Sequence, residues 1–100
     1  MQGINVIDYS TLAVSSSAVD LIADGDPALP NQAKRAYITC ETQQVRWRAD
    51  GTAPSATEGH ILGKDDSISF TGANYRQQLE KIEFICTSSG DGKLKITYFD

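Results

Sequence analysis

The feature that most constrains this chain is the short period of its apolar residues. Apolar and polar side chains alternate in short runs that Gly, Ser, Asp and Pro residues separate. Such alternation is typical of half-buried β-strands, because successive side chains of a strand point to opposite faces. No stretch longer than about ten residues shows the i, i+3, i+4, i+7 spacing of a helix. About eight short strands in 100 residues predict an all-β fold, an antiparallel two-sheet β-sandwich of jelly-roll or immunoglobulin-like kind.

Two pairs of runs predict the core most clearly. Residues 34–41 and 43–50 form one predicted hairpin, and residues 79–87 and 93–99 form another around the turn 88–92. Alternate residues of these strands are apolar and are expected to face inward: Ala36, Ile38, Cys40, Val45, Trp47, Ala49, Ile82, Phe84, Cys86, Leu94, Ile96 and Tyr98. Shorter strands are expected within residues 4–9, 11–14, 60–62 and 67–70, with a loose helical turn at 75–78. Residues 18–22 are expected to form either another short strand or one helical turn.

The charge of the chain is unevenly distributed. Residues 1–33 contain four aspartates and no lysine or arginine, whereas the acidic and basic residues of 34–100 balance. Nucleic-acid binding requires clustered cations, so we expect no direct nucleic-acid partner. We interpret residues 1–100 as a single domain in which residues 1–33 are either a solvated segment or an acidic N-terminal arm that docks on a basic protein surface.

Metal and cofactor sites are not expected. Asp24 and Asp26 flank Gly25 as in a calcium loop, but the closing glutamate and the other ligand positions are missing. Cys40 and Cys86 are expected to be reduced, buried thiols because no export signal is visible, although a disulfide would be geometrically possible if their strands were neighbours. The lack of CxxC spacing argues against a zinc site.

An enzyme is not expected either. His60 is the sole histidine and has no serine or cysteine motif beside it, so we interpret it as a structural residue hydrogen-bonded at the base of a loop. No run approaches the ~20 apolar residues of a membrane helix. The first residues lack the basic and apolar regions of a signal peptide, which predicts synthesis and retention in a cytosol.

Candidate binding residues lie on faces and loops that the core does not need. Arg46 and Arg48 share the outward face of their strand and are expected either to be solvated or ion-paired, or to meet a partner's carboxylates. Phe99 lies on an otherwise polar face, where it either caps the core edge or contacts another chain. The candidate protein–protein interface comprises Asp20, Asp24, Asp26, Arg46, Arg48, Thr52, Pro54 and Phe99.

The order of several short motifs resembles small β-rich virion proteins of tailed bacteriophages, encoded among head genes. The motifs are residues 36–41 (AYITCE), 45–48 (VRWR), 50–55 (DGTAPS), 59–62 (GHIL), 66–70 (DSISF) and 95–99 (KITYF). The resemblance covers about two thirds of the chain and leaves residues 1–33 unmatched. It implies a non-enzymatic capsid decoration (cement) protein, often a homotrimer, that binds the major capsid protein on the virion surface after synthesis in the bacterial host cytoplasm.

An alternative role is a module of a tail, neck or fibre that binds host-surface glycan or another virion protein. That role requires exposed aromatic side chains. Trp47, which alternates with outward arginines, is interpreted as a core residue rather than part of a ligand surface.

Overall fold

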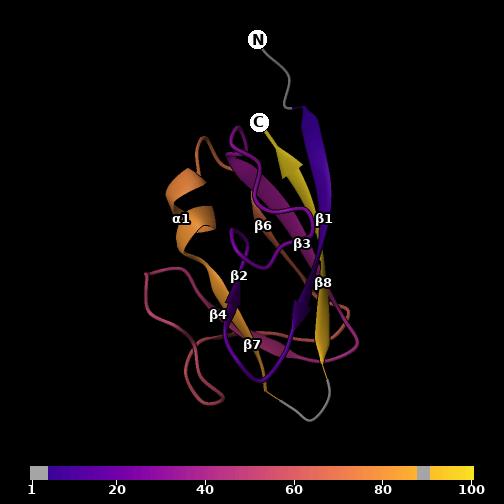
Figure 1. Cartoon of the computed structure of the whole chain (residues 1–100), viewed down its shortest axis with the longest axis vertical. Coiled ribbons are helices and arrows are strands. Elements are labelled where there is room, and N and C mark those ends of the chain that lie inside the picture. The colour runs from indigo at the N-terminus through magenta and orange to yellow at the C-terminus, as the bar shows by residue number, and fades with distance from the viewer. Residues whose placement is uncertain (1–4, 88–90) are drawn as a thin grey trace.

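The computed structural model describes residues 5–87 and 91–100, which form two antiparallel four-stranded sheets (Figure 1). The first sheet contains, in spatial order, β1 (Val6–Val14), β8 (Gly92–Phe99), β3 (Arg35–Glu41) and β6 (Ser67–Phe70). The second sheet contains β2 (Val19–Asp20), β7 (Glu83–Cys86), β4 (Val45–Arg48) and β5 (His60–Leu62). A short helix, α1 (Arg76–Lys81), precedes β7. The predicted all-β sandwich is confirmed.

The path of the chain between the sheets identifies the sandwich as a jelly roll. Successive strands alternate between the first and second sheets, except that β4 and β5 are neighbours in the second sheet. The spatial orders β1-β8-β3-β6 and β2-β7-β4-β5 are those of two Greek keys wound around one core. An immunoglobulin-like sandwich pairs several consecutive strands within a sheet, so the jelly-roll alternative is the one that the structure adopts.

Both predicted hairpins are wrong. β3 is hydrogen-bonded to β8 and β6, whereas β4 is hydrogen-bonded to β7 and β5. Thr42, at φ 72°, turns the chain across the core into the other sheet instead of back along β3. β7 and β8 likewise belong to different sheets, and residues 88–90 of their predicted turn lie outside the described residues. The alternation of apolar and polar residues is the same for a hairpin and for a strand that crosses to the other sheet. In both cases each strand directs its apolar side chains toward the space between the sheets.

The predicted strand 79–87 begins later than expected, at Glu83. The residues before it extend the predicted helical turn into α1, whose Leu79 is completely buried. Arg76 and Glu80 form an ion pair of 2.9 Å one helical turn apart. A helix this short contributes a single apolar contact to the core, so no repeated helical spacing is visible in the sequence.

The core lies between the inward faces of the two sheets. Phe84 and Tyr98 are its largest fully buried side chains. The other buried apolar residues are Leu12, Val14, Leu21, Leu29, Ala33, Ala36, Ile38, Cys40, Val45, Leu62, Leu79, Ile82, Cys86, Leu94 and Ile96. Trp47 and Ala49 are partly buried against this cluster. The alternation therefore predicted the inward faces of β3, β4, β7 and β8 correctly.

The first third of the chain is built into the sandwich. β1 pairs with β8 from Val6 to Val14, with a bulge near its start, and joins the predicted extended segments 4–9 and 11–14 into one strand from Val6 onward. The loop after β2 is bonded to β1 by two backbone hydrogen bonds between Thr11 and Asp26. A docking role for this segment would therefore use the surface of the sandwich rather than a detached arm.

The helix content is limited to α1 in the described residues. No helix among them is both long and apolar enough to cross a membrane.

Candidate functional site

The acidic candidates of the first third stabilise turns. The backbone N–H of Ala23 donates to Asp20 Oδ1 at 2.6 Å, and the backbone N–H of Asp20 donates to Asp24 Oδ2 at 3.0 Å. Asp24 and Asp26 are exposed. Within the described part of the chain, no three His, Cys, Asp or Glu side chains are grouped as metal ligands. These aspartates cap the turn after β2 and line the edge beside β1.

Arg48 forms a two-point ion pair at the end of β4. Its Nε and Nη2 atoms donate to Asp50 Oδ1 and Oδ2 at 3.1 and 2.5 Å. The hydrogen bonds from Arg48 lower the pKa of the Asp50 carboxyl, which keeps that group ionised at neutral pH. Arg48 is therefore ion-paired within the chain, and its guanidinium is fixed beside the loop that follows β4.

Arg46 holds the far end of that loop. Its Nη1 atom donates to the backbone carbonyl of Gly59 at 2.8 Å. Its side chain lies on the outer face of the second sheet between Ile85 of β7 and Ile61 of β5, which are its lateral neighbours in the register. Arg46 thus ties the start of β5 to β4 instead of projecting freely from the sheet.

The loop 51–59 has a defined internal structure. Ser55 Oγ accepts hydrogen bonds from the backbone N–H groups of Thr57 and Glu58 at 3.2 and 3.0 Å, as the hydroxyl-rich sequence predicts. Thr52 is exposed, but Pro54 is buried, so the Pro54 side chain shapes the loop and is not accessible as a contact. Gly59 has φ 133°, and a Cβ there would lie 3.2 Å from Pro54 Cβ.

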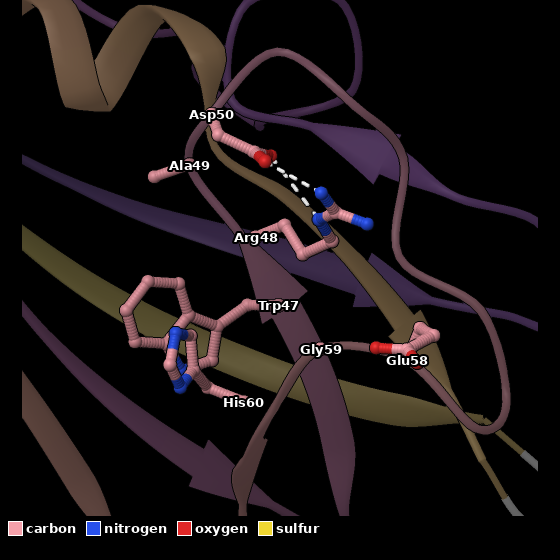
Figure 2. Close-up of a pocket in the computed structure, with 7 residues that line it drawn as sticks. All are labelled: Trp47, Arg48, Ala49, Asp50, Glu58, Gly59 and His60. Atoms are coloured by element: carbon pink, nitrogen blue, oxygen red, sulfur yellow. Dashed lines mark hydrogen bonds and ion pairs between the residues drawn. The ribbon is translucent and has the colours of Figure 1, made fainter.

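A surface hollow of about 430 Å³ opens where β4 and β5 diverge. Strand pairing ends at Trp47 and His60, and beyond this pair the two segments separate around the loop. Trp47, Arg48, Ala49, Asp50, Glu58, Gly59 and His60 line the hollow (Figure 2). Figure 2 shows the two rings together on one side of β4, with the Arg48–Asp50 pair on the other and Glu58 on the returning loop. The hollow therefore combines aromatic and charged walls.

Four aromatic rings form a continuous row beside this hollow. The rings of Trp47 and His60 are 4.7 Å apart at a 38° tilt. Trp47 also meets Phe70 edge-on at 5.7 Å, and Phe70 contacts Tyr75 at 5.5 Å. The hydrogen bond predicted for His60 is not present among the described residues, where its ring instead makes a tilted contact with the Trp47 ring. Trp47 is both a core-packing residue and part of the wall of the hollow.

A second surface feature lies on the outer face of the first sheet. We call Val6, Tyr9, Tyr37 and Phe99 the aromatic face; Val6, Tyr9 and Tyr37 are exposed by 64%, 54% and 42%. The register places Tyr9, Thr97 and Tyr37 in one row across β1, β8 and β3, and Val6 beside Phe99 in the next. The sequence indicated only Phe99 here. Tyr9 and Thr11 are two residues apart on β1 and therefore share a face. The alternation in the sequence could thus have indicated Tyr9 as a second residue of the aromatic face.

The two cysteines are buried and face the core from opposite sheets. Burial raises the pKa of the Cys40 thiol to about 11, with a smaller contribution from the neighbouring Cys86. The Cys40 thiol is therefore protonated at neutral pH, and its Sγ donates to the Gln43 carbonyl at 3.0 Å. Reduced, buried thiols were predicted, and this environment makes Cys40 a packing residue.

The chain thus has the fold of an eight-stranded jelly roll with an aromatic sheet face and a separate polar–aromatic hollow. The eight predicted interface residues are not brought together: Arg46, Arg48, Thr52 and Pro54 lie at the second sheet and its loop, and Phe99 lies on the first sheet. Comparison of the chain with protein-family models, curated proteins and solved structures found no match.

Proposed function

We propose that this chain is a non-enzymatic structural protein of a tailed-phage virion that decorates the capsid by binding the shell of the major capsid protein. The observation that carries the proposal is the aromatic face. Contiguous exposed apolar side chains mark interaction sites, and aromatic residues are enriched at the centres of protein interfaces. The resemblance of residues 36–99 to virion proteins supplies the class of partner.

The charges around the aromatic face define the surface that it fits. Three basic residues of β3 and β8 lie on the same side of the sheet as the aromatic face: Arg35, Lys93 and Lys95. Glu41 is the one acidic residue that these two strands place on that side. The Arg35 guanidinium is held by the backbone carbonyls of Gly72, Ala73 and Asp100. The partner surface is therefore expected to be apolar with carboxylates at its margin, the reverse of the basic surface expected for an acidic arm.

The physical basis of decoration is mass action. A protein that binds the expanded shell, and not its disassembled or unexpanded forms, stabilises that shell by a free energy that rises with the logarithm of its concentration divided by its Kd. A homotrimer multiplies weak contacts through effective concentration. The chain is therefore expected to form a trimer, and light scattering of the purified 10.8 kDa chain should report three times this mass. A monomer at micromolar concentration would contradict the trimer.

The docking face is tested by co-sedimentation with expanded capsids that lack the protein. The double variant Tyr9→Ser/Tyr37→Ser removes two large exposed side chains and should lower shell binding at least tenfold. Ile61→Ser is the matched control, because Ile61 is equally exposed, at 56%, but belongs to the second sheet. Thermal unfolding should be similar for all variants. Unchanged shell binding by the double variant would refute the assignment of the face.

The alternative role, recognition of a host-surface glycan, is favoured by a different feature, the hollow between β4 and β5. The hollow belongs to the second sheet and the aromatic face to the first. One molecule therefore has room for both contacts.

A further inference from the structure

We propose that the hollow between β4 and β5 is a saccharide-binding site that takes a neutral hexose unit. The site uses none of the residues of the aromatic face, so it does not depend on capsid docking. Its volume, about 430 Å³, lies within the usual range of small-molecule sites, roughly 300–1,000 Å³. Three features of its walls select this ligand class: a fixed aromatic ring, hydrogen-bonding groups with free capacity, and a balance of positive and negative charge.

The aromatic wall is held in place before any ligand arrives. Trp47 contacts the tilted His60 ring at 4.7 Å and the Phe70 ring, edge to face, at 5.7 Å, and it also packs against the core. Pyranose rings present C–H groups on their faces, which pack against the electron-rich face of an aromatic ring. An indole that is already fixed loses little side-chain entropy on binding, and this favours affinity.

The polar wall offers hydrogen-bonding groups that the fold leaves available. Asp50 and Arg48 hold each other through two hydrogen bonds, and each retains further acceptor or donor capacity. No hydrogen bond joins the Glu58 carboxylate or the His60 ring to another side chain or backbone group in the described part of the chain. Vicinal hydroxyl groups of a sugar both donate and accept, so an adjacent carboxylate and guanidinium match two of them at once.

The charges at the hollow balance, which suits a neutral ligand. The Asp50 and Glu58 carboxylates and the Arg48 guanidinium line it, and the Arg46 guanidinium donates to the carbonyl of Gly59 in the same lining. Arg48 is paired with Asp50 and also faces the charge of Glu58. A sialate, uronate or phosphate would meet carboxylates and guanidinium groups that already match one another, whereas a neutral hexose brings no charge that has to be compensated.

The loop keeps the hollow open. The Arg46–Gly59 hydrogen bond and the buried Pro54 fix the returning segment, and the hydrogen bonds of Ser55 fix the turn before it. The wall that carries Glu58 is therefore positioned by the chain itself, as a preformed site requires.

Fluorescence of Trp47 is the direct readout, because the chain contains no other tryptophan. We expect a saturable change in emission on titration with one of a panel of neutral gluco-, galacto- or manno-oligosaccharides. Asp50→Asn and Glu58→Gln should each weaken that ligand at least tenfold, as measured by calorimetry. Glu41→Gln, an exposed acidic residue on the first sheet, is the matched control and should leave the affinity unchanged.

The same panel contains the outcomes that overturn the proposal. Equal binding of sialylated and neutral oligosaccharides, binding of a lysine-rich peptide alone, or no response to any sugar at millimolar concentration would each refute a neutral saccharide site. Asp50→Asn and Glu58→Gln should keep full binding to expanded capsids, so failure of the saccharide site and failure of capsid docking give different results.

Discussion

Gly59 allows the most direct test of how the loop shapes the hollow, because the chain provides its own control. Gly51 and Gly59, at the two ends of the loop, have φ values of 90° and 133°, where an L side chain is strained. A Cβ at Gly51 would meet nothing within 4 Å. A Cβ at Gly59 would lie 3.1 Å from the Trp47 carbonyl oxygen, 3.2 Å from Pro54 Cβ and 3.3 Å from Arg46 Cβ.

The difference between the two sites predicts the magnitudes. Gly51→Ala adds backbone strain of 1–2 kcal/mol, partly offset by the lower entropy of the unfolded chain, for a net loss of about 1 kcal/mol. Gly59→Ala adds at least as much strain, because φ 133° lies further from the left-handed region that L residues adopt. It also adds an overpacking cost of about 2 kcal/mol, because the neighbours of the new Cβ are backbone or Cβ atoms. The expected total for Gly59→Ala is about 3 kcal/mol. For a chain of this length, 1 kcal/mol lowers the Tm by about 5 °C.

The assay is thermal and urea unfolding of both variants, followed by circular dichroism and Trp47 fluorescence. We expect the Tm to fall by about 5 °C for Gly51→Ala and about 15 °C for Gly59→Ala. Trp47 emission in the folded state should change only for Gly59→Ala, since the added methyl group presses on the Trp47 carbonyl. Equal losses for the two variants would refute the argument that close packing at Gly59, rather than backbone conformation alone, fixes the loop.

Two further predictions concern the core. Phe84→Ala, at a completely buried position, should lower the free energy of unfolding by about 3–5 kcal/mol in urea titrations, whereas a loss below 1 kcal/mol would mean that the two sheets do not close on this ring. Because burial raises the pKa of the Cys40 thiol from 9.0 to about 11, its contribution to stability should be complete below pH 9 and lost as the pH rises through about 11; Cys40→Ala should flatten this part of the pH profile. Native Cys40 should also resist alkylation at pH 8 until urea unfolds the chain, and rapid labelling of the folded protein would contradict its burial.

The sequence predicts which face of each strand is buried better than it predicts which strands pair with one another. Alternation identified Ile38, Phe84 and Ile96 as inward residues because the period of a strand is a local property. Strand pairing is not local: the turn at Glu41–Thr42 indicates that the chain reverses, but not that it crosses into the other sheet. The two incorrect hairpins both arose from this difference.

The candidate sites show the same limit. The sequence indicated Arg46, Arg48, Thr52 and Pro54 as candidates, but the hollow exists only because β4 and β5 pair as far as Trp47 and His60 and then separate. Arg48 was predicted to face outward, and its partner Asp50 is two residues away along the chain. The aromatic face combines β1, β8 and β3, so its members could not be placed side by side before the order of these strands was known.

The place of β8 has a consequence for how the protein is made. β8 lies between β1 and β3 in the first sheet, yet it is the last of the eight described strands to leave the ribosome. Until then β1 has no lateral partner strand, and β3 has only β6. The first sheet can therefore be completed only once β8 has been synthesised. Contacts between residues far apart in the chain form slowly in general, so we expect the edges of β1 and β3 that pair with β8 to stay open until then.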